Sequence, residues 1–567
     1  MASVAVLGGG VGGLSAAHEL AKRGFRVRVY EAREVFGGKA RSIPVPDSGA
    51  IPLPGEHGFR FFPGFYQHLD ATMAEIPYQG RTVKDNLVQA TEMLMARADG
   101  ANELIAPMQF PLGIGDLTKL VKFMFAIATT LGIPLHEFAS FFERILAYLT
   151  ACDERRLAEF ESQSWWEFTD AKNRSKAFQK FLATGMTRTL VAARAEEMSA
   201  RTGCAILTQL LQDMAEVSGQ PDRVLNGPTS DVWLDPWVDY LRGKDNVVLH
   251  GGHRIAGIHC GGGSITGVTV ESKDGPKVIE ADYYVAALPV ERLQNLLTND
   301  IRTADPQLAR IDRLTTRWMN GVQFYLDVPA KLPRGHAIFI DSPWALTALA
   351  QQQFWSRKLG DCGNGHCKDI VSVDVSDWDE PGLIYKKAAN VCTADEIFAE
   401  VWAQMAAHFD HEEIKEENVV HKFLDPGIEF PNPSKVTNLE PLLINTAGSW
   451  KNRPDAVTRI PNLVLAADFV RTNTDLATME GANEAARRAV NGILAKEKAP
   501  YQPCPVFALK EPLALAPFRF ADALHWRFGF RGPKKSPLRV TGSGELQGTD
   551  PVARGMLAAA RLATAKS

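Results

Sequence analysis

The sequence has few cysteines, and their scatter excludes a disulfide-stabilised secreted domain. Seven cysteines are spread over 567 residues, which indicates a reducing compartment. Cys362 and Cys367 are the one close set, and without a second pair at metal-ligand spacing they favour a loop insertion over a ligand cluster. We therefore predict no metal centre and a cytoplasmic location.

The sequence also has no block of basic residues and no run of apolar residues long enough for a simple membrane span. The formal net charge of −4 gives no electrostatic reason to expect a nucleic acid partner. The nearest candidate span, residues 117–135, carries Lys119 and Lys122 and favours a buried amphipathic helix, with a helix that dips into a membrane surface as the alternative. Met1 leads directly into an apolar strand, so we expect no secretory signal.

The first residues have the pattern of a strand, a glycine-rich turn and a helix. Residues 4–7, Val-Ala-Val-Leu, are typical of a buried parallel strand. The turn and the start of the helix contain the candidate cofactor residues Gly8, Gly10, Val11, Gly12 and Gly13. This G-x-G-x-x-G spacing lets the backbone approach a pyrophosphate, toward which the helix N-terminus directs its N–H groups. The segment predicts a dinucleotide-binding unit.

The residues that follow indicate which dinucleotide is bound. Residues 26–30 predict a second strand, and Glu31 and Ala32 follow it. Glu31 lies about 20 residues after the glycines, where a carboxylate accepts hydrogen bonds from the adenosine ribose and disfavours the 2′-phosphate of NADP. A second glycine turn adds the candidate residues Gly37, Gly38, Lys39 and Arg41. The guanidinium of Arg41 would approach the same pyrophosphate.

Together these residues resemble the flavin-containing amine oxidase and carotenoid desaturase superfamily, which implies FAD as the cofactor. Residues 460–494 resemble its closing segment, in which a strand precedes Asp468 at the ribityl or pyrophosphate groups. The resemblance implies that Ile255 presents its backbone to adenine. It also implies a helix start beside the flavin pyrimidine ring, formed by Thr478, Met479 and Ala482.

The resemblance implies an α/β fold with a Rossmann-type FAD-binding domain that is discontinuous in sequence and carries an inserted α+β substrate domain. We assign three segments to the FAD-binding domain: 1–100, 241–300 and 455–500. Two segments, 101–240 and 301–454, form the substrate domain, and 501–567 is a C-terminal extension. The aromatic and basic residues of 506–535 favour either contact with a membrane surface or packing on the catalytic body.

Other segments favour the desaturase branch. Residues 55–66, G-E-H-G-F-R-F-F-P-G-F-Y, resemble a stretch of carotenoid desaturases, with Arg60 where many of them have histidine. Segments of the same likeness are 225–229, 234–240, 327–329 and 374–379. Amine oxidases of the superfamily usually have a lysine where Asn320 and Gly321 stand, and an aromatic residue where Thr478 stands. Both differences argue against amine oxidation.

The implied activity is dehydrogenation of an apolar, isoprenoid- or lipid-like substrate by hydride transfer to flavin N5, with a quinone or O₂ as electron acceptor. The candidate catalytic residues are Arg60, His57 and Asp475. Arg60 would stabilise reduced flavin or a developing anion, or tie its loop to the cofactor. Asp475 would take a proton or cap the helix that begins at Met479. Three alternatives stay open: an amine or amino-acid oxidase that uses O₂, a redox-neutral isomerase or dehydroxylase, and a protein in which the flavin is structural.

Overall fold

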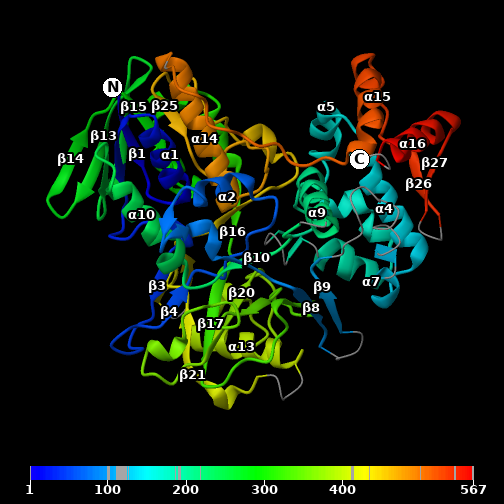
Figure 1. Cartoon of the computed structure of the whole chain (residues 1–567), viewed down its shortest axis with the longest axis horizontal. Coiled ribbons are helices and arrows are strands. Elements are labelled where there is room, and N and C mark those ends of the chain that lie inside the picture. The colour runs from blue at the N-terminus through cyan, green and yellow to red at the C-terminus, as the bar shows by residue number, and fades with distance from the viewer. Residues whose placement is uncertain are drawn as a thin grey trace.

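The computed structural model has three parts, an α/β part at the N-terminus, a second sheet beside it, and a helical part that the C-terminal segment covers (Figure 1). The described residues are 2–98, 103–109, 124–125, 127–185, 187–188, 193–216, 219–409, 414–432, 435–498, 500–541 and 545–564. The start of the candidate amphipathic helix, residues 117–123, lies outside them. Within the described ranges, no helix is both long and apolar enough to cross a membrane.

A five-stranded parallel sheet is assembled from distant segments of the chain. Its order is β11–β2–β1–β15–β25. The strands are β1 (Ser3–Leu7), β2 (Arg26–Tyr30), β11 (Val247–His250), β15 (Tyr283–Ala286) and β25 (Leu463–Leu465). The order reverses between β1 and β15, and in such sheets a ligand binds at the carboxyl ends of the strands beside that point. The Rossmann-type architecture expected from the sequence is confirmed.

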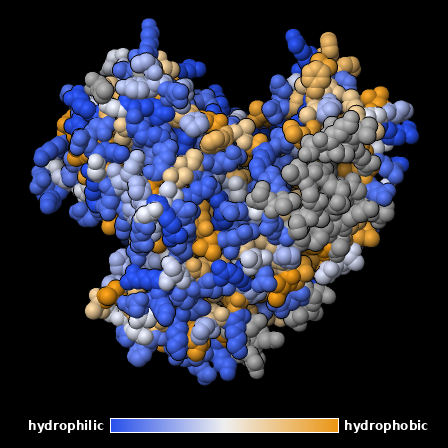
Figure 2. All heavy atoms as spheres, viewed as in Figure 1, coloured by the Kyte–Doolittle hydropathy of each residue, from blue (hydrophilic) through white to orange (hydrophobic). Residues whose placement is uncertain are grey.

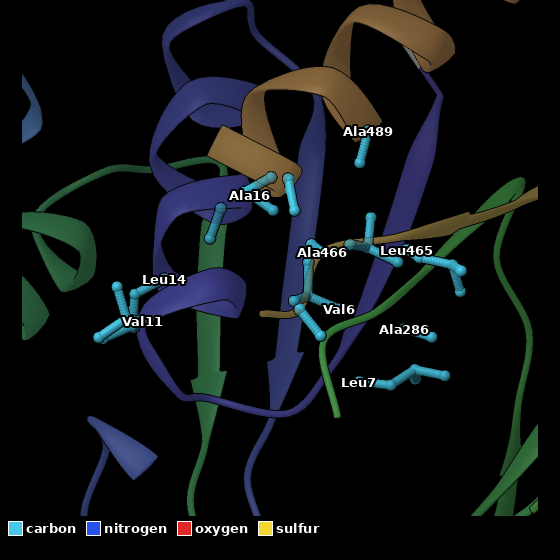
Figure 3. Packing of buried hydrophobic residues seen from close by; sticks show 14 of the residues in the cluster. Val6, Leu7, Val11, Leu14, Ala16, Ala286, Leu465, Ala466 and Ala489 are labelled. Carbon is cyan, nitrogen blue, oxygen red and sulfur yellow. The ribbon is translucent and has the colours of Figure 1, made fainter. Parts of the chain in front are cut away.

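Small residues let two helices pack closely on this sheet. Helix α1 (Val11–Lys22) lies beside α14 (Met479–Glu497), the helix of the closing segment. Figure 3 shows Ala16, Val6, Ala466 and Ala489 where these helices meet the strands, with Leu14 beside Val11 on the other side of α1. The side chains are short, so the two ends of the chain come together at one cofactor site.

The second sheet has seven strands in the order β21–β17–β20–β19–β18–β8–β9. The strands are β8 (Glu92–Ala96), β9 (Leu104–Pro107), β17 (Asn320–Leu326), β18 (Gly335–Phe339), β19 (Thr347–Ala350), β20 (Asp369–Val375) and β21 (Val419–Leu424). Helix α13 (Ala394–Ala406) packs its apolar side chains against this sheet. Strand β8 lies inside the segment 1–100, yet it pairs with β18 in this second sheet.

The helical part contains α4 (Leu135–Leu149), α6 (Trp165–Thr169) and α9 (Ala200–Ala215). The C-terminal segment adds α15 (Ala516–Arg527), α16 (Pro551–Thr564), β26 (Leu538–Val540) and β27 (Leu546–Gly548). Leu515, Phe518 and Val540 are buried in the same apolar cluster as α4. Asp522 of α15 accepts a hydrogen bond from the Cys152 backbone at 2.9 Å. The extension therefore packs on the helical part.

Shorter elements connect these parts. A three-stranded sheet beside the cofactor part consists of β12 (Arg254–Gly261), β13 (Ser264–Ser272) and β14 (Gly275–Ile279). The helices that flank the cofactor part are α2 (Gln67–Met73), α10 (Asp235–Arg242), α11 (Val290–Gln294) and α12 (Asn299–Ala304). Two-stranded pairs join β3 (Ser42–Pro44) to β4 (Pro54–Glu56), β7 (Leu87–Gln89) to β10 (Arg223–Leu225), and β16 (Thr315–Arg317) to β24 (Leu442–Ile444).

Candidate functional site

The two glycine turns contact each other at the carboxyl edge of the parallel sheet. The Gly37 N–H donates to the Gly9 carbonyl at 2.8 Å. A Cβ on Gly10 would lie 3.7 Å from the Gly38 Cα, so the two turns face each other with little side chain between them. Helix α1 begins after Gly10. This N-cap residue has no side chain, so it provides no side-chain acceptor for the described N–H groups of the first turn. These N–H groups suit an anion such as a pyrophosphate.

The charged candidates gather at the same edge. Glu31 is buried at the end of β2, followed by the exposed Ala32, and accepts hydrogen bonds from the Gly9 N–H at 2.8 Å and the Arg33 N–H at 3.0 Å. Arg41 donates to the Gly38 carbonyl at 2.7 Å and to Glu440 at 3.0 Å. Lys39 lies 3.4 Å from Glu291. A carboxylate and two cations therefore surround the glycine turns.

The closing segment reaches this edge from the other end of the chain. Thr478 is the N-cap of α14 and accepts a hydrogen bond from the Gly481 N–H at 3.2 Å. The Ala482 carbonyl lies 3.6 Å from the position of a Cβ on Gly12. Asp468, Thr478 and Met479 line a cavity at this point. Glycines, an uncapped helix start and a carboxylate beside β2 together fit the pyrophosphate and ribose of FAD.

Ile255 follows a turn that contacts Glu31, and it is not among the described residues that line the cavity. It is buried in β12, where it pairs with Val270. The turn before Ile255 is hydrogen-bonded to the carboxyl edge of the parallel sheet, which we call the cofactor edge. The His253 N–H donates to the Glu31 carbonyl there at 2.7 Å. Its contact with adenine stays a prediction.

A cavity of about 930 Å³ extends from the cofactor edge into the second sheet and the helical part. Lys39, Asp468 and Met479 line one end of it. Its other walls include the apolar side chains of Met93, Met95, Met108, Phe181, Leu207, Leu210, Leu211, Met214, Ile338 and Phe339. A volume of this size, mostly apolar with a few polar groups, is typical of a small-molecule site.

His57 and Arg60 both line the cavity on the loop after β4. The His57 Nδ1 lies 2.5 Å from Asp425 Oδ2 and 3.6 Å from Glu440 Oε2. Burial raises the pKa of Asp425, but His57 and hydrogen bonds outweigh it and hold that pKa below its ordinary value. Arg60 donates to the Lys39 carbonyl at 2.7 Å, so it ties this loop to the cofactor segment.

The ligand atoms of His57, Asp425 and Glu440 lie within 4.8 Å of one another, a spacing that a metal ion could fit. The surrounding charges favour an ion-pair network instead. Arg33 and Arg41 both pair with Glu440, and a guanidinium beside a carboxylate opposes a second cation there. Cys362 and Cys367, the close set in the sequence, are unpaired and buried in an apolar cluster.

The comparison with known families agrees with this geometry. The model of the family described as flavin containing amine oxidoreductase matches residues 11–494. The chain belongs to this family. It is a flavin-dependent oxidoreductase, and its cofactor is FAD. The C-terminal extension of this flavoprotein lies beyond the matched residues.

Individual relatives differ in activity. A 15-cis-phytoene desaturase of Synechococcus elongatus is 24% identical over 503 residues, which cover 87% of this chain and 96% of that protein. A zeta-carotene desaturase of Synechocystis sp. is 24% identical over 523 residues, covering 87% and 97%. The structure of putrescine oxidase bound to putrescine has a TM-score of 0.58 and 14% identity, covering 87% of this flavoprotein and 99% of that chain. That likeness shows the fold alone.

Asp475 does not have the role in helix capping that its position indicated. The prediction that it caps the helix at Met479 is wrong, because Thr478 is the N-cap. Its carboxylate pairs with Arg201 and Arg453, each at 2.7 Å, and accepts from the Thr202 hydroxyl at 2.8 Å. Among the described residues, Asp475 is not one that lines the cavity. These contacts leave it poorly placed to accept a proton from substrate.

Three residues that have no role predicted from the sequence, Asp374, His336 and Asp222, meet at the cavity wall. Asp374 of β20 accepts a backbone hydrogen bond from Phe59, and the His336 Nδ1 lies 2.6 Å from Asp222 Oδ2. A carboxylate in the apolar run of β20 was a local signal that could have revealed Asp374. The pair of His336 and Asp222, 114 residues apart, had no such signal.

Asp374 is expected to make the stability of the flavoprotein depend on pH. Burial raises its pKa to about 7 from the ordinary value of 3.8, although Arg60 and His336 lower it. The folded state therefore holds this proton up to about pH 7, whereas the unfolded chain loses it near pH 4. The contribution of Asp374 to the free energy of unfolding is complete below about pH 4 and is lost as the pH rises through about 7.

Urea unfolding at pH 5 and pH 8 measures this effect. We expect Asp374→Asn to lose less stability than the wild type between the two pH values, by roughly 2–4 kcal/mol. Asp274→Asn, in an exposed turn, is the matched control. An equal loss in the wild type and Asp374→Asn would contradict the raised pKa.

Proposed function

We propose that this flavoprotein dehydrogenates an apolar substrate of isoprenoid or lipid type. The observation that carries the proposal is the largely apolar cavity that opens at the cofactor edge. The desaturases among its relatives support the same substrate class. When bound, FAD would supply the chemistry of accepting a hydride equivalent from one carbon of the substrate, while the neighbouring carbon would lose a proton to a base or to water. The protein supplies position, because the walls of the cavity fix which carbon lies beside the cofactor.

The polar residues at the cofactor end have separate roles in this proposal. Asp425 holds the Nδ1 side of His57, which orients the ring and directs its other nitrogen away from Asp425. Arg60 places a positive charge beside the Lys39 segment, where it favours negative charge on a reduced cofactor. We propose a quinone or O₂ as the electron acceptor.

An anaerobic titration of the oxidised holoenzyme tests the function. Apolar polyenes, isoprenoids and amines are added in turn while the flavin absorbance is followed. We expect bleaching by an isoprenoid or lipid and none by amines. Bleaching by amines alone would overturn the proposal and favour an amine oxidase.

Arg60→Ala is expected to retain FAD and to slow flavin reduction by about 100-fold, the usual effect of removing one charged group that stabilises developing negative charge. The rate comes from stopped-flow measurement with whichever substrate bleaches the flavin, and the flavin content is read from absorbance. Arg242→Ala, on the exposed part of α10, is the control. A normal rate in Arg60→Ala would leave Arg60 with the tethering role alone.

A redox-neutral reaction is the second candidate, and Asp374 favours it. With a pKa raised to about 7 by burial, this carboxyl is partly protonated at neutral pH and is able to act as an acid in the cavity. An isomerase or dehydroxylase of this kind would convert its substrate without lasting bleaching of the flavin. Product analysis from the same titration distinguishes the two reactions.

We also propose that α15 contacts an anionic membrane surface. One face of this segment is buried through Phe518 and Asp522, but Leu513, Phe520, Phe528 and Phe530 are 64–83% exposed. Figure 2 shows apolar residues at the tip of this helix. Arg527 and Arg531 lie in the same segment, and basic residues beside exposed aromatic ones favour acidic lipid headgroups.

Co-sedimentation with vesicles that contain an anionic phospholipid tests this contact. A variant with Phe520→Ser, Phe528→Ser and Phe530→Ser is expected to bind at least about tenfold more weakly, because less apolar surface enters the bilayer. The matched control replaces Val248, Val278 and Val420, exposed residues elsewhere, with serine. Equal binding of both variants would contradict the assignment of α15.

A further inference from the structure

One face of the seven-stranded sheet forms a wall of the cavity. Alternate residues of a strand point to the same face, and Met93, His336, Thr347 and Asp374 from four different strands all line the cavity. The register brings them together, because Asp374 pairs with Thr347 and His336 pairs with Met93. Thr347 also pairs with Ile338, two residues after His336. Three polar side chains therefore lie on neighbouring strands of one wall.

Each of these three side chains has a polar atom without a hydrogen-bond partner among the described residues. The atoms are Asp374 Oδ1, Thr347 Oγ1 and His336 Nε2. The residues themselves are at most 8% exposed. A buried polar group without a partner costs about 1–3 kcal/mol, so three of them on one cavity wall indicate that a ligand supplies their partners. Asp222 already holds the Nδ1 of His336, which leaves Nε2 as the ring nitrogen available to a ligand.

The three polar side chains lie beside the loop that carries Phe59 and Phe61. The His336 ring is 4.9 Å from that of Phe59 and 5.3 Å from that of Phe61, on the loop that Arg60 ties to the cofactor segment. On the other side of His336, the wall continues into Met93 and Met95 of β8. Leu207, Leu210, Leu211 and Met214 of α9 also line the cavity. Apolar side chains of β8 and α9 therefore line the cavity beside the three polar ones.

We infer that the substrate is an apolar chain that carries a hydroxyl or carbonyl oxygen, and that Asp374, Thr347 and His336 hydrogen-bond this oxygen. The inference rests on the proposed function and narrows its substrate class. A pure hydrocarbon would leave all three protein atoms without partners. An alcohol donates to the Asp374 carboxylate or the His336 nitrogen and accepts from the Thr347 hydroxyl. A carbonyl accepts from Thr347 and from whichever of the other two carries a proton.

Binding to the oxidised holoenzyme tests this inference without turnover. The probes are geranylgeraniol and the hydrocarbon of the same skeleton without the hydroxyl, in the same detergent. Quenching of tryptophan fluorescence, to which Trp166 in the cavity wall contributes, gives the two dissociation constants. We expect the alcohol to bind about tenfold more tightly than the hydrocarbon. Thr347→Val and Asp374→Leu are expected to bring this ratio close to one.

A matched substitution outside the cavity is the control. Thr437→Val lies in a different two-stranded sheet, β22 (Ile428–Asn432) with β23 (Lys435–Asn438), and is expected to keep the wild-type ratio. Flavin content and unfolding temperature confirm that each variant is folded. Thr347→Val keeps the shape of the side chain, so it tests the inference even if Asp374→Leu does not fold.

The inference would be overturned if the wild type bound the alcohol and the hydrocarbon equally, or bound neither. It would also be overturned if Thr347→Val kept the preference for the alcohol. The proposed function fails differently. A preference for the alcohol with no bleaching in the anaerobic titration would refute dehydrogenation and support the polar contact. Bleaching by a hydrocarbon with no preference for the alcohol would support dehydrogenation and refute the polar contact.

Discussion

Gly13→Ala is expected to abolish FAD retention and to destabilise the protein by about 3 kcal/mol or more. A Cβ on Gly13 would lie 1.9 Å from the Gly8 carbonyl oxygen, so the glycine turn and α1 could not keep their contact. The helix has no room to shift sideways, because a Cβ on the neighbouring Gly12 would lie 2.0 Å from the Ala466 carbonyl oxygen. The ratio of flavin to protein absorbance and urea unfolding measure the two effects.

Substitutions at two other glycines distinguish loss of FAD binding from loss of the fold. A Cβ on Gly10 meets only the Gly38 Cα within the described residues, at 3.7 Å, so Gly10→Ala is expected to fold normally and to bind FAD weakly. Apart from the neighbouring backbone of its own helix, no described heavy atom lies within 4 Å of a Cβ on Gly555, so Gly555→Ala in α16 is expected to keep FAD and to raise the free energy of unfolding by up to about 1 kcal/mol. Full flavin content in Gly13→Ala would refute the assignment of this turn to the pyrophosphate.

Asp475→Asn is expected to lower the free energy of unfolding by about 3–5 kcal/mol, the usual cost of removing one partner from a buried ion pair. Arg453 is almost fully buried, and burial lowers its pKa while Asp475 raises it. Without the carboxylate, Arg453 and Arg201 would repel each other, and among the described residues Glu161 and Asp468 would be left to balance the charge on Arg453. Asparagine tolerates the left-handed backbone of position 475, where φ is 47°, so the change removes charge and little else.

Unfolding and turnover together determine which role Asp475 has. If the role of Asp475 is structural, Asp475→Asn unfolds at a lower urea concentration, but each folded molecule reduces its flavin at a near-normal rate. A rate lowered by orders of magnitude at unchanged stability would restore Asp475 as a proton acceptor. Asp239→Asn, at an exposed position of α10, controls for the loss of a carboxylate as such.

The cofactor edge could be predicted from the sequence because its parts are local. A strand, a glycine turn and a carboxylate within about forty residues fix one another by chain connectivity, and the expected strands 4–7 and 26–30 match β1 and β2 closely. The closing segment was found in the same way, since its strand and helix are adjacent in sequence. The α/β architecture and FAD follow from these segments.

The cavity wall could not be predicted, because its residues become neighbours only through long-range strand pairing. Asp374 and Thr347 face each other across two strands, and neither position has a sequence pattern that reveals its partner. Asp475 was misassigned for a related reason. Aspartate and threonine are both good N-cap residues, and only the distant Arg201 and Arg453 exclude the aspartate from that role.

Strand β8 makes the substrate chamber depend on the cofactor region. This strand follows the glycine turns and the Arg60 loop along the chain, yet it supplies Met93 and Met95 to the cavity wall through parallel pairing with β18. The second sheet is incomplete without β8, and the parallel sheet is incomplete without β25, which follows the strands of the second sheet along the chain. The flavoprotein therefore has no self-sufficient half that could be excised, and the shape of the cavity is set in part by the chain segment that carries the glycine turns.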